Sequence, residues 1–252
     1  MGKVLFDGES DFGRYQIVEQ VYHERLARVL FSGDALPQSG VALDDDPELL
    51  FSYNQRFLEI ALSVMPKSIL VIGGGAFTLP KALLERFAGA TIDVVEIDPL
   101  LPELARTYFD LPSSSKLNVI VADGREFVEG RKKKYDLIIL DAFSGHEIPR
   151  SLMSVNAAAQ YTYLLASNGI IAMNFIAPYQ HGRISLADRL IATFRTKFTD
   201  IELYPADPHE SPHSKQNYVL VVAKKRIPSL DYLQSASAQL YDGDDAHLVM
   251  TD

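Results

Sequence analysis

Residues 69–76 read Ile-Leu-Val-Ile-Gly-Gly-Gly-Ala, an apolar run that leads directly into three glycines. A strand that turns abruptly into a helix needs residues without a Cβ, and glycine also lets backbone N–H groups approach a ligand closely. The next apolar run ends on an acidic pair, whose first carboxylate can accept hydrogen bonds from the hydroxyls of a ribose. The glycines could instead serve packing alone. The spacing favours a nucleotide site, with these candidate residues: Gly73, Gly74, Gly75, Glu96 and Asp98.

Short apolar runs and amphipathic stretches alternate from residue 68 onward. Runs typical of strands in a covered parallel sheet lie at 68–72, 91–96, 117–122, 135–141 and 169–175. Helices are expected after Pro99 and over 156–166 and 185–198. Two later runs, 201–204 and 218–223, have no helical pattern between them and predict an antiparallel pair. We expect an α/β fold with a Rossmann-like doubly wound sheet of the S-adenosylmethionine-dependent transferase type, whose last strand is antiparallel.

The first 45 residues have a different pattern. Strand-like runs at 16–22 and 26–31, with a turn signal at 32–34, predict a small N-terminal β-hairpin subdomain over 1–45. Residues 46–252 are expected to form the Rossmann-like nucleotide-binding catalytic domain. The run Asp44-Asp45-Asp46-Pro47 predicts the start of a helix that ends near Val64, and residues 228–252 predict a helix with an acidic tail.

Composition and charge restrict the possible partners. A formal net charge of −9 argues against nucleic acid, which is bound through clustered Lys and Arg. No apolar run approaches the ~20 residues that span a bilayer, so we expect a cytoplasmic protein with no membrane partner. Zero cysteines exclude disulfides and thiolate metal sites. An acidic surface suits a cationic substrate such as an amine.

Two more acidic residues follow strands of the same predicted sheet. Asp123, with Gly124, follows the third strand, where a carboxylate can accept from the exocyclic amine of adenine. Taken alone, Asp123 is better interpreted as a helix cap. Asp141 closes the fourth strand at the centre of the crevice. Together with the glycines and Glu96 they converge on one end of the sheet, where open α/β folds bind ligands.

Several motifs, in this order, resemble the spermidine synthase family, the aminopropyltransferases of the class I S-adenosylmethionine-dependent transferase superfamily. They are Arg14-Tyr15-Gln16, Phe51-Ser52-Tyr53, Val71-Ile72-Gly73-Gly74-Gly75, Val95-Glu96-Ile97-Asp98, Asp123-Gly124-Arg125 and the run Tyr135 to Asp141.

The resemblance implies decarboxylated S-adenosylmethionine as co-substrate and a homodimer or homotetramer. It implies that Glu96 holds the ribose, Asp123 the adenine edge and Asp141 the reacting amine. It also places Tyr53 and Gln16 in the substrate pocket, with Asp141 and Tyr53 as the catalytic residues. Without the resemblance, Tyr53 is better interpreted as a core aromatic, because it lies in an apolar stretch.

The chain departs from the family pattern at several positions. The glycine motif of the family continues Asp-Gly-Gly, whereas here it continues Ala76-Phe77-Thr78, without the carboxylate expected for the donor ammonium. The strand-four motif keeps Asp141 but has Ser144 where the family has the acid that anchors the amine acceptor. The glycine-rich aromatic segment before the last strand is replaced by the run 208–213.

These observations predict a spermidine synthase-like transferase that binds S-adenosylmethionine or its decarboxylated form and transfers an aminopropyl-type group to a small amine or metabolite. Activity on putrescine is doubtful. Alternatives are a methyltransferase, or a non-catalytic protein that binds an adenosine ligand. A dinucleotide oxidoreductase is disfavoured, because the spacing is not Gly-x-Gly-x-x-Gly. No metal is expected, since His209 and His213 lie in a Pro-rich loop.

Overall fold

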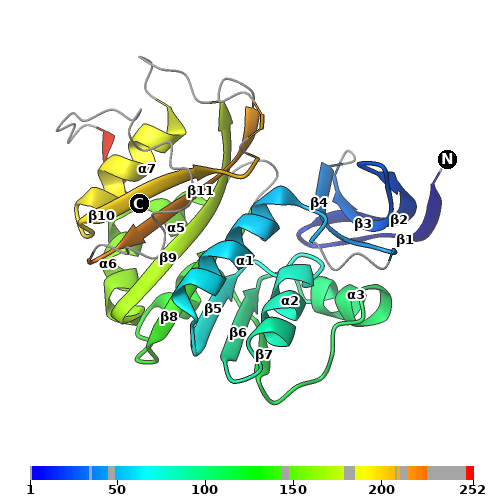
Figure 1. The fold of residues 1–252 in the computed structure, drawn as a ribbon, viewed down its shortest axis with the longest axis horizontal. Coiled ribbons are helices and arrows are strands. Elements are labelled where there is room, and N and C mark those ends of the chain that lie inside the picture. The colour runs from blue at the N-terminus through cyan, green and yellow to red at the C-terminus, as the bar shows by residue number, and fades with distance from the viewer. Residues whose placement is uncertain are drawn as a thin grey trace.

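A computed structural model describes residues 2–33, 36–44, 49–143, 148–178, 185–207, 209–210, 215–225 and 248–252. It contains a small N-terminal sheet beside a larger sheet that carries helices on both faces (Figure 1).

The N-terminal sheet has four antiparallel strands in the order β1-β2-β3-β4. They are β1 (Lys3–Ser10), β2 (Gly13–Tyr22), β3 (Arg25–Ser32) and β4 (Leu36–Ala42). The predicted N-terminal β-hairpin subdomain is confirmed, and its sheet also contains β1 and β4, which the sequence pattern did not predict. β1 and β4 are edge strands, where half-exposed residues and Pro37 weaken the apolar alternation that identifies a strand. The tight turn between β2 and β3 lies at His23 and Glu24, which both have positive φ, and the turn signal at 32–34 falls between the end of β3 and the start of β4.

The larger sheet has seven strands in the order β10-β11-β9-β8-β5-β6-β7. All neighbours pair in parallel except those of β11, which lies antiparallel between β9 and β10. The predicted fold class is confirmed. The strands are β5 (Ser68–Ile72), β6 (Thr91–Glu96), β7 (Leu117–Val121), β8 (Tyr135–Leu140), β9 (Leu165–Pro178), β10 (Asp200–Pro205) and β11 (Lys215–Ala223).

Helices cover both faces of this sheet and enclose two apolar cores. The described helices are α1 (Ser52–Val64), α2 (Thr78–Arg86), α3 (Leu100–Tyr108), α4 (Gly124–Val128), α5 (Arg150–Met153), α6 (Val155–Leu164) and α7 (Leu186–Arg195). One core lies under α1 and α2, and the other lies under α4, α6 and α7. A third cluster joins Leu101 and Leu104 of α3 to Tyr15 and Ile17 of β2, so the N-terminal sheet is packed on the larger unit.

Two predicted helix boundaries were wrong. α1 begins at Ser52 and not near Pro47, because Leu50 and Phe51 pack against the N-terminal sheet in a non-helical conformation. Tertiary packing thus overrides the local capping signal. α6 ends at Leu164, since Leu165 already belongs to β9.

The tail predicted at 228–252 is described only for its last five residues. Leu248 is buried, and the carbonyl of Met250 accepts a hydrogen bond from the Val155 amide at the start of α6. Within the described ranges, no helix is long and apolar enough to cross a membrane. The division into 1–45 and 46–252 stays a prediction.

Candidate functional site

A pocket of about 800 Å³ opens at the carboxyl ends of the central strands, between the two sheets. This volume is typical of a small-molecule site. Its floor includes residues that follow β5, β6 and β8, and its wall includes Tyr15, Gln38 and Ser39 from the N-terminal sheet. These predicted site residues line it: Tyr53, Gly73, Gly74, Gly75, Glu96, Asp123, Gly124 and Asp141.

Glycine is required at the turn after β5 for packing as well as for conformation. Gly73 has a φ of 97°, and a Cβ there would lie 2.4 Å from the backbone oxygen of Asp141. A Cβ on Gly74 would lie 2.5 Å from the ring of Phe77. The Gly73 amide donates to the carbonyl of Val95 at 2.9 Å, which fixes the turn to β6.

The carboxylate of Glu96 already binds the backbone amides of this turn. Its Oε2 accepts from the amides of Gly74 at 2.7 Å and Gly75 at 3.3 Å, and its Oε1 accepts from the amide of Asp98 at 3.0 Å. Glu96 is buried, and this burial raises its pKa although the three amides act in the opposite direction. A phosphate placed on these amides would meet a carboxylate, so the turn suits a neutral or cationic group better than a pyrophosphate.

The structure does not bring Asp98 into the pocket. Its side chain is 1% exposed and accepts from Ser10 Oγ at 2.5 Å and from the amide of Leu100 at 2.9 Å. It therefore ties the N-terminal sheet to the start of α3. Asp98 lies two residues beyond Glu96, the last residue of β6, and its carboxylate is used at the start of α3 instead of in the pocket.

Gln16 also lies outside the pocket lining. Its Nε2 donates to Asp7 Oδ2 at 2.8 Å on the exposed face of the N-terminal sheet. Successive side chains of a strand point to opposite faces, so its neighbour Tyr15 faces the pocket instead.

Asp123 serves as a helix cap at the edge of the pocket. Its Oδ1 accepts from the amides of Arg125 at 2.7 Å and Glu126 at 2.9 Å, at the start of α4. The interpretation of Asp123 as a helix cap is confirmed. Asp123 also lines the pocket, and its hydrogen bond to adenine stays a prediction. Gly124 is required here because a Cβ would lie 2.5 Å from Ile72 Cγ2.

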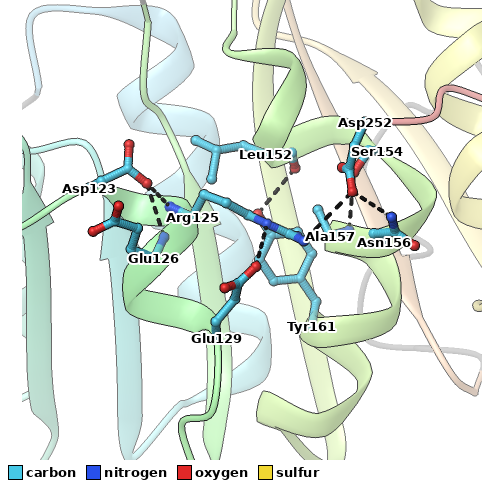
Figure 2. Close-up of polar contacts among 10 residues, drawn as sticks. All are labelled: Asp123, Arg125, Glu126, Glu129, Leu152, Ser154, Asn156, Ala157, Tyr161 and Asp252. Carbon is cyan, nitrogen blue, oxygen red and sulfur yellow. Dashed lines mark hydrogen bonds and ion pairs between the residues drawn. The ribbon is translucent and has the colours of Figure 1, made fainter.

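Arg125 anchors this loop on its other side. Figure 2 shows the side chain reaching from α4 toward the start of α6. Its Nε lies 3.2 Å from Glu129 Oε1, and its Nη2 lies 3.9 Å from Asp252 Oδ2. Asp252 in turn accepts hydrogen bonds from Ser154 Oγ and Asn156 Nδ2. The described C-terminal segment therefore supports the loop that carries Asp123.

Asp141 lies at the end of β8 in the middle of the pocket lining. Burial raises its pKa to about 7; a hydrogen bond from Asn174 Nδ2 at 2.8 Å opposes this rise, and the negative charge of Glu96 adds to it. Both protonation states are therefore populated near neutral pH, as an acid or base catalyst requires.

Sequence reasoning missed the amides that hold Asp141. Asn174 of β9 is 1% exposed, and its Oδ1 accepts from Asn217 Nδ2 of β11 at 2.9 Å. Both side chains line the pocket. The signal in the sequence was an asparagine inside the apolar strand 169–175, since a buried amide needs partners.

Tyr53 both lines the pocket and packs among core aromatic residues, so each of its two predicted positions matches the structure. Its ring packs near Phe51 and Phe57, with centroids 5.9 and 6.3 Å away, and its hydroxyl donates to the carbonyl of Gln38 at 2.7 Å. Burial raises its pKa well above the ordinary value, and the charge of Asp141 adds to the rise. It thus forms a rigid, neutral wall of the pocket.

Asn54 was also missed. It is 2% exposed and lines the pocket, and its Oδ1 accepts no hydrogen bond from the described residues. A buried acceptor without a partner is costly, so a donor on a ligand is a natural partner.

Some predicted features lie outside the described residues: Ser144, His213 and most of the 208–213 run. Among the residues that are described, no cluster of three or more His, Cys, Asp or Glu side chains is placed to hold a metal ion.

A family model and related sequences point to the same family of proteins, and solved structures share its fold. The family model for the spermine/spermidine synthase domain matches residues 50–198. The chain is 30% identical to a polyamine aminopropyltransferase of Vibrio vulnificus strain CMCP6, over 77% of this chain and 63% of that protein's length. The fold resembles a probable spermidine synthase from Corynebacterium glutamicum ATCC 13032, with a TM-score of 0.77, 22% identity, and coverage of 90% of this chain and 82% of that one.

A spermidine synthase in complex with the transition-state analogue AdoDATO is also similar in fold. Its TM-score is 0.72 at 19% identity, and the match covers 92% of this chain and 76% of that one.

Proposed function

The chain belongs to the spermine/spermidine synthase domain family, and from this premise we propose that it is an aminopropyltransferase-like enzyme. It binds S-adenosylmethionine or its decarboxylated form and transfers an aminopropyl-type group to a small amine or metabolite. The observation that carries the proposal is one pocket in which the glycine turn and Glu96 face Asp141 across the ends of β5, β6 and β8.

The pocket divides into two halves along the sheet. The half over β5, β6 and β7 holds Glu96 and Asp123 and suits the adenosine of a donor. The half over β8, β9 and β11 holds Asp141, Asn174 and Asn217 and suits an acceptor. Asp141 lies on the side of the acceptor half that adjoins the donor half, because β8 is the neighbour of β5, and the reacting atoms would meet there.

The reaction that fits this arrangement is one in-line substitution. The lone pair of the acceptor nitrogen attacks the carbon beside the donor sulfonium, a C–N bond forms, and the C–S bond breaks with its electron pair on sulfur. The products are the alkylated amine and methylthioadenosine. The amine must lose a proton, and Asp141 with a pKa of about 7 can accept it near neutral pH. Holding both reactants in line supplies the rest of the acceleration.

A cationic donor also suits the charges. Three carboxylates line the pocket at Glu96, Asp123 and Asp141, and one of them already occupies the amides of the glycine turn. A sulfonium is attracted to this lining, whereas the pyrophosphate of a dinucleotide would be repelled. This supports the sulfonium donor over NAD.

Methyl transfer from S-adenosylmethionine is the second candidate, and Ala76 favours it. Ala76 is 2% exposed and packs in the apolar cluster with Tyr15, Leu101 and Leu104. The carboxylate that the resemblance expects there for the donor ammonium is absent. Putrescine is a doubtful acceptor for a separate reason, because Ser144 stands where the family has the acid that anchors the amine acceptor.

Calorimetry with S-adenosylmethionine, its decarboxylated form, methylthioadenosine and NAD tests the donor. A mass-spectrometric screen of amines and metabolites with both donors then tests transfer. Aminopropylated product supports the main proposal, and methylated product supports the second candidate. Binding of methylthioadenosine without any product indicates the non-catalytic alternative.

A homodimer or homotetramer is part of the proposal. Val21 and Leu26 are exposed and lie opposite each other on β2 and β3, which leaves an apolar pair on the N-terminal sheet. Light scattering after size exclusion measures the oligomer directly.

Location in the cytoplasm also stays a prediction, which cell fractionation checks.

A further inference from the structure

The acceptor half of the pocket combines one carboxylate with one lysine. Asp141 is the only acidic residue that the described strands β8, β9 and β11 contribute to the lining. The same lining includes Lys215, the first residue of β11, whose side chain is exposed. A diamine would therefore place its distal ammonium near another ammonium, which like-charge repulsion disfavours.

The strand register places Lys215 beyond Asn217 on the same face. Asn217 lies opposite Ile176 of β9, and Lys215 lies opposite Pro178. Side chains two residues apart on a strand share a face, so Lys215 continues the row in which Asn217 contacts Asn174.

The distance from Asp141 to Lys215 suits a short bifunctional acceptor. β11 is two strands away from β8, which corresponds to about 10 Å across the sheet at about 4.8 Å per strand. Asp141 follows Leu140, the partner of Met173, and Lys215 lies four residues beyond Val219, the partner of Asn174, which adds about 13 Å along the strand at about 3.3 Å per residue. The two Cα atoms are therefore about 16 Å apart. The lysine stem covers part of this span, and a chain of a few carbons covers the remainder. At the other end, the buried Oδ1 of Asn54 can accept from the reacting amine.

Resting on the transferase function proposed above, we propose that the acceptor is an amine that also carries a carboxylate, as an ω-amino acid does. Its amine lies at Asp141 and Asn54, and its carboxylate pairs with Lys215. The transfer step is the substitution described above: the nitrogen of the amino acid gains the alkyl group, its proton passes to Asp141, and the donor leaves as a neutral thioether. The carboxylate takes no part in bond making and only orients the acceptor.

Putrescine and 4-aminobutanoate form a matched pair of probes, because both have four carbons and differ only at the distal group. Each is titrated by calorimetry into protein saturated with methylthioadenosine, and each is assayed for transfer with both donors. We expect 4-aminobutanoate to bind about 5- to 30-fold more tightly than putrescine, a range between an exposed ion pair and a hydrogen bond to a charged group. Lys215→Glu should reverse this preference, and Lys215→Gln should abolish it.

Lys116→Glu is the matched control, since Lys116 is exposed and lies outside the pocket lining. This variant carries the same charge change and should keep the preference of the parent. Circular dichroism checks that each variant folds.

The outcomes separate the two proposals. Equal or tighter binding of putrescine by the parent, or a preference that Lys215→Glu leaves unchanged, overturns the inference. If neither putrescine nor 4-aminobutanoate binds, the inference is overturned as well. Selective binding of 4-aminobutanoate with no transfer from either donor supports the acceptor class and contradicts the transferase function instead.

Discussion

Replacing Asp141 by asparagine should stabilise the protein at neutral pH while it abolishes transfer. The substitution keeps the shape of the side chain and an acceptor for Asn174, and it removes a charge that burial and Glu96 both disfavour. Catalytic sites commonly store such unfavourable charges, so removing one exchanges activity for stability.

The magnitude follows from the pKa of Asp141, which rises from 3.8 to about 7 on folding. The folded state holds this proton more tightly than the unfolded chain, so the free energy of unfolding falls as pH rises from about 4 to about 7. About three units at ~1.4 kcal/mol each give an upper bound of about 4 kcal/mol. Asp141 is only partly shielded from solvent, so we expect about 2 kcal/mol.

Urea denaturation of parent and Asp141→Asn at pH 5, 6, 7 and 8 measures this effect. The stability advantage of the variant should grow with pH and level off above about pH 7.5. Comparing the two proteins at each pH cancels the titration of all other groups. An advantage that stays constant from pH 5 to 8, or a less stable variant at pH 8, would refute the desolvation of Asp141.

Three further predictions concern the surroundings of the pocket. Asn174→Leu removes the hydrogen bond that lowers the pKa of Asp141, so the acidic limb of the pH–rate profile should move to higher pH by about 1–2 units. If the limb does not move, Asn174 does not control the pKa of the catalytic group. Ala76→Asp buries a carboxylate in an apolar cluster and should cost about 3 kcal/mol in urea denaturation; unchanged stability would mean that the acid reaches the pocket. Ser154 and Asn156 lower the pKa of Asp252, so their contribution is present at neutral pH and lost as pH falls through that pKa. Asp252→Asn should therefore be less stable than the parent at pH 7 and equal to it at acidic pH, and a deficit that persists in acid contradicts this linkage.

The sequence predicted the central sheet because its strands are buried on both faces. Runs such as 68–72 and 91–96 are nearly all apolar and match β5 and β6. The N-terminal sheet was predicted only in part, because edge strands alternate weakly. The start of α1 was missed because the packing of Phe51 on the N-terminal sheet is a tertiary effect that the local pattern does not contain.

Site residues were predictable where they follow strands. Glu96 is the last residue of β6 and Asp141 directly follows β8, and strand order alone brings them together. Gln16 was misplaced because the register of a strand with half-buried faces decides which neighbour points inward. Asn54 and Asn217 were missed because their role depends on contacts across α1 and β11 that no spacing in the chain reveals.

The most direct test of the whole account is calorimetric titration of methylthioadenosine into the parent and into Glu96→Ala, with NAD as the competing ligand. We expect methylthioadenosine to bind the parent, the variant to lose about 10- to 100-fold in affinity, as for a hydrogen bond to a charged group, and NAD to bind neither protein. Unchanged affinity in Glu96→Ala, or tighter binding of NAD than of methylthioadenosine, would contradict the assignment of this pocket to an adenosine sulfonium donor.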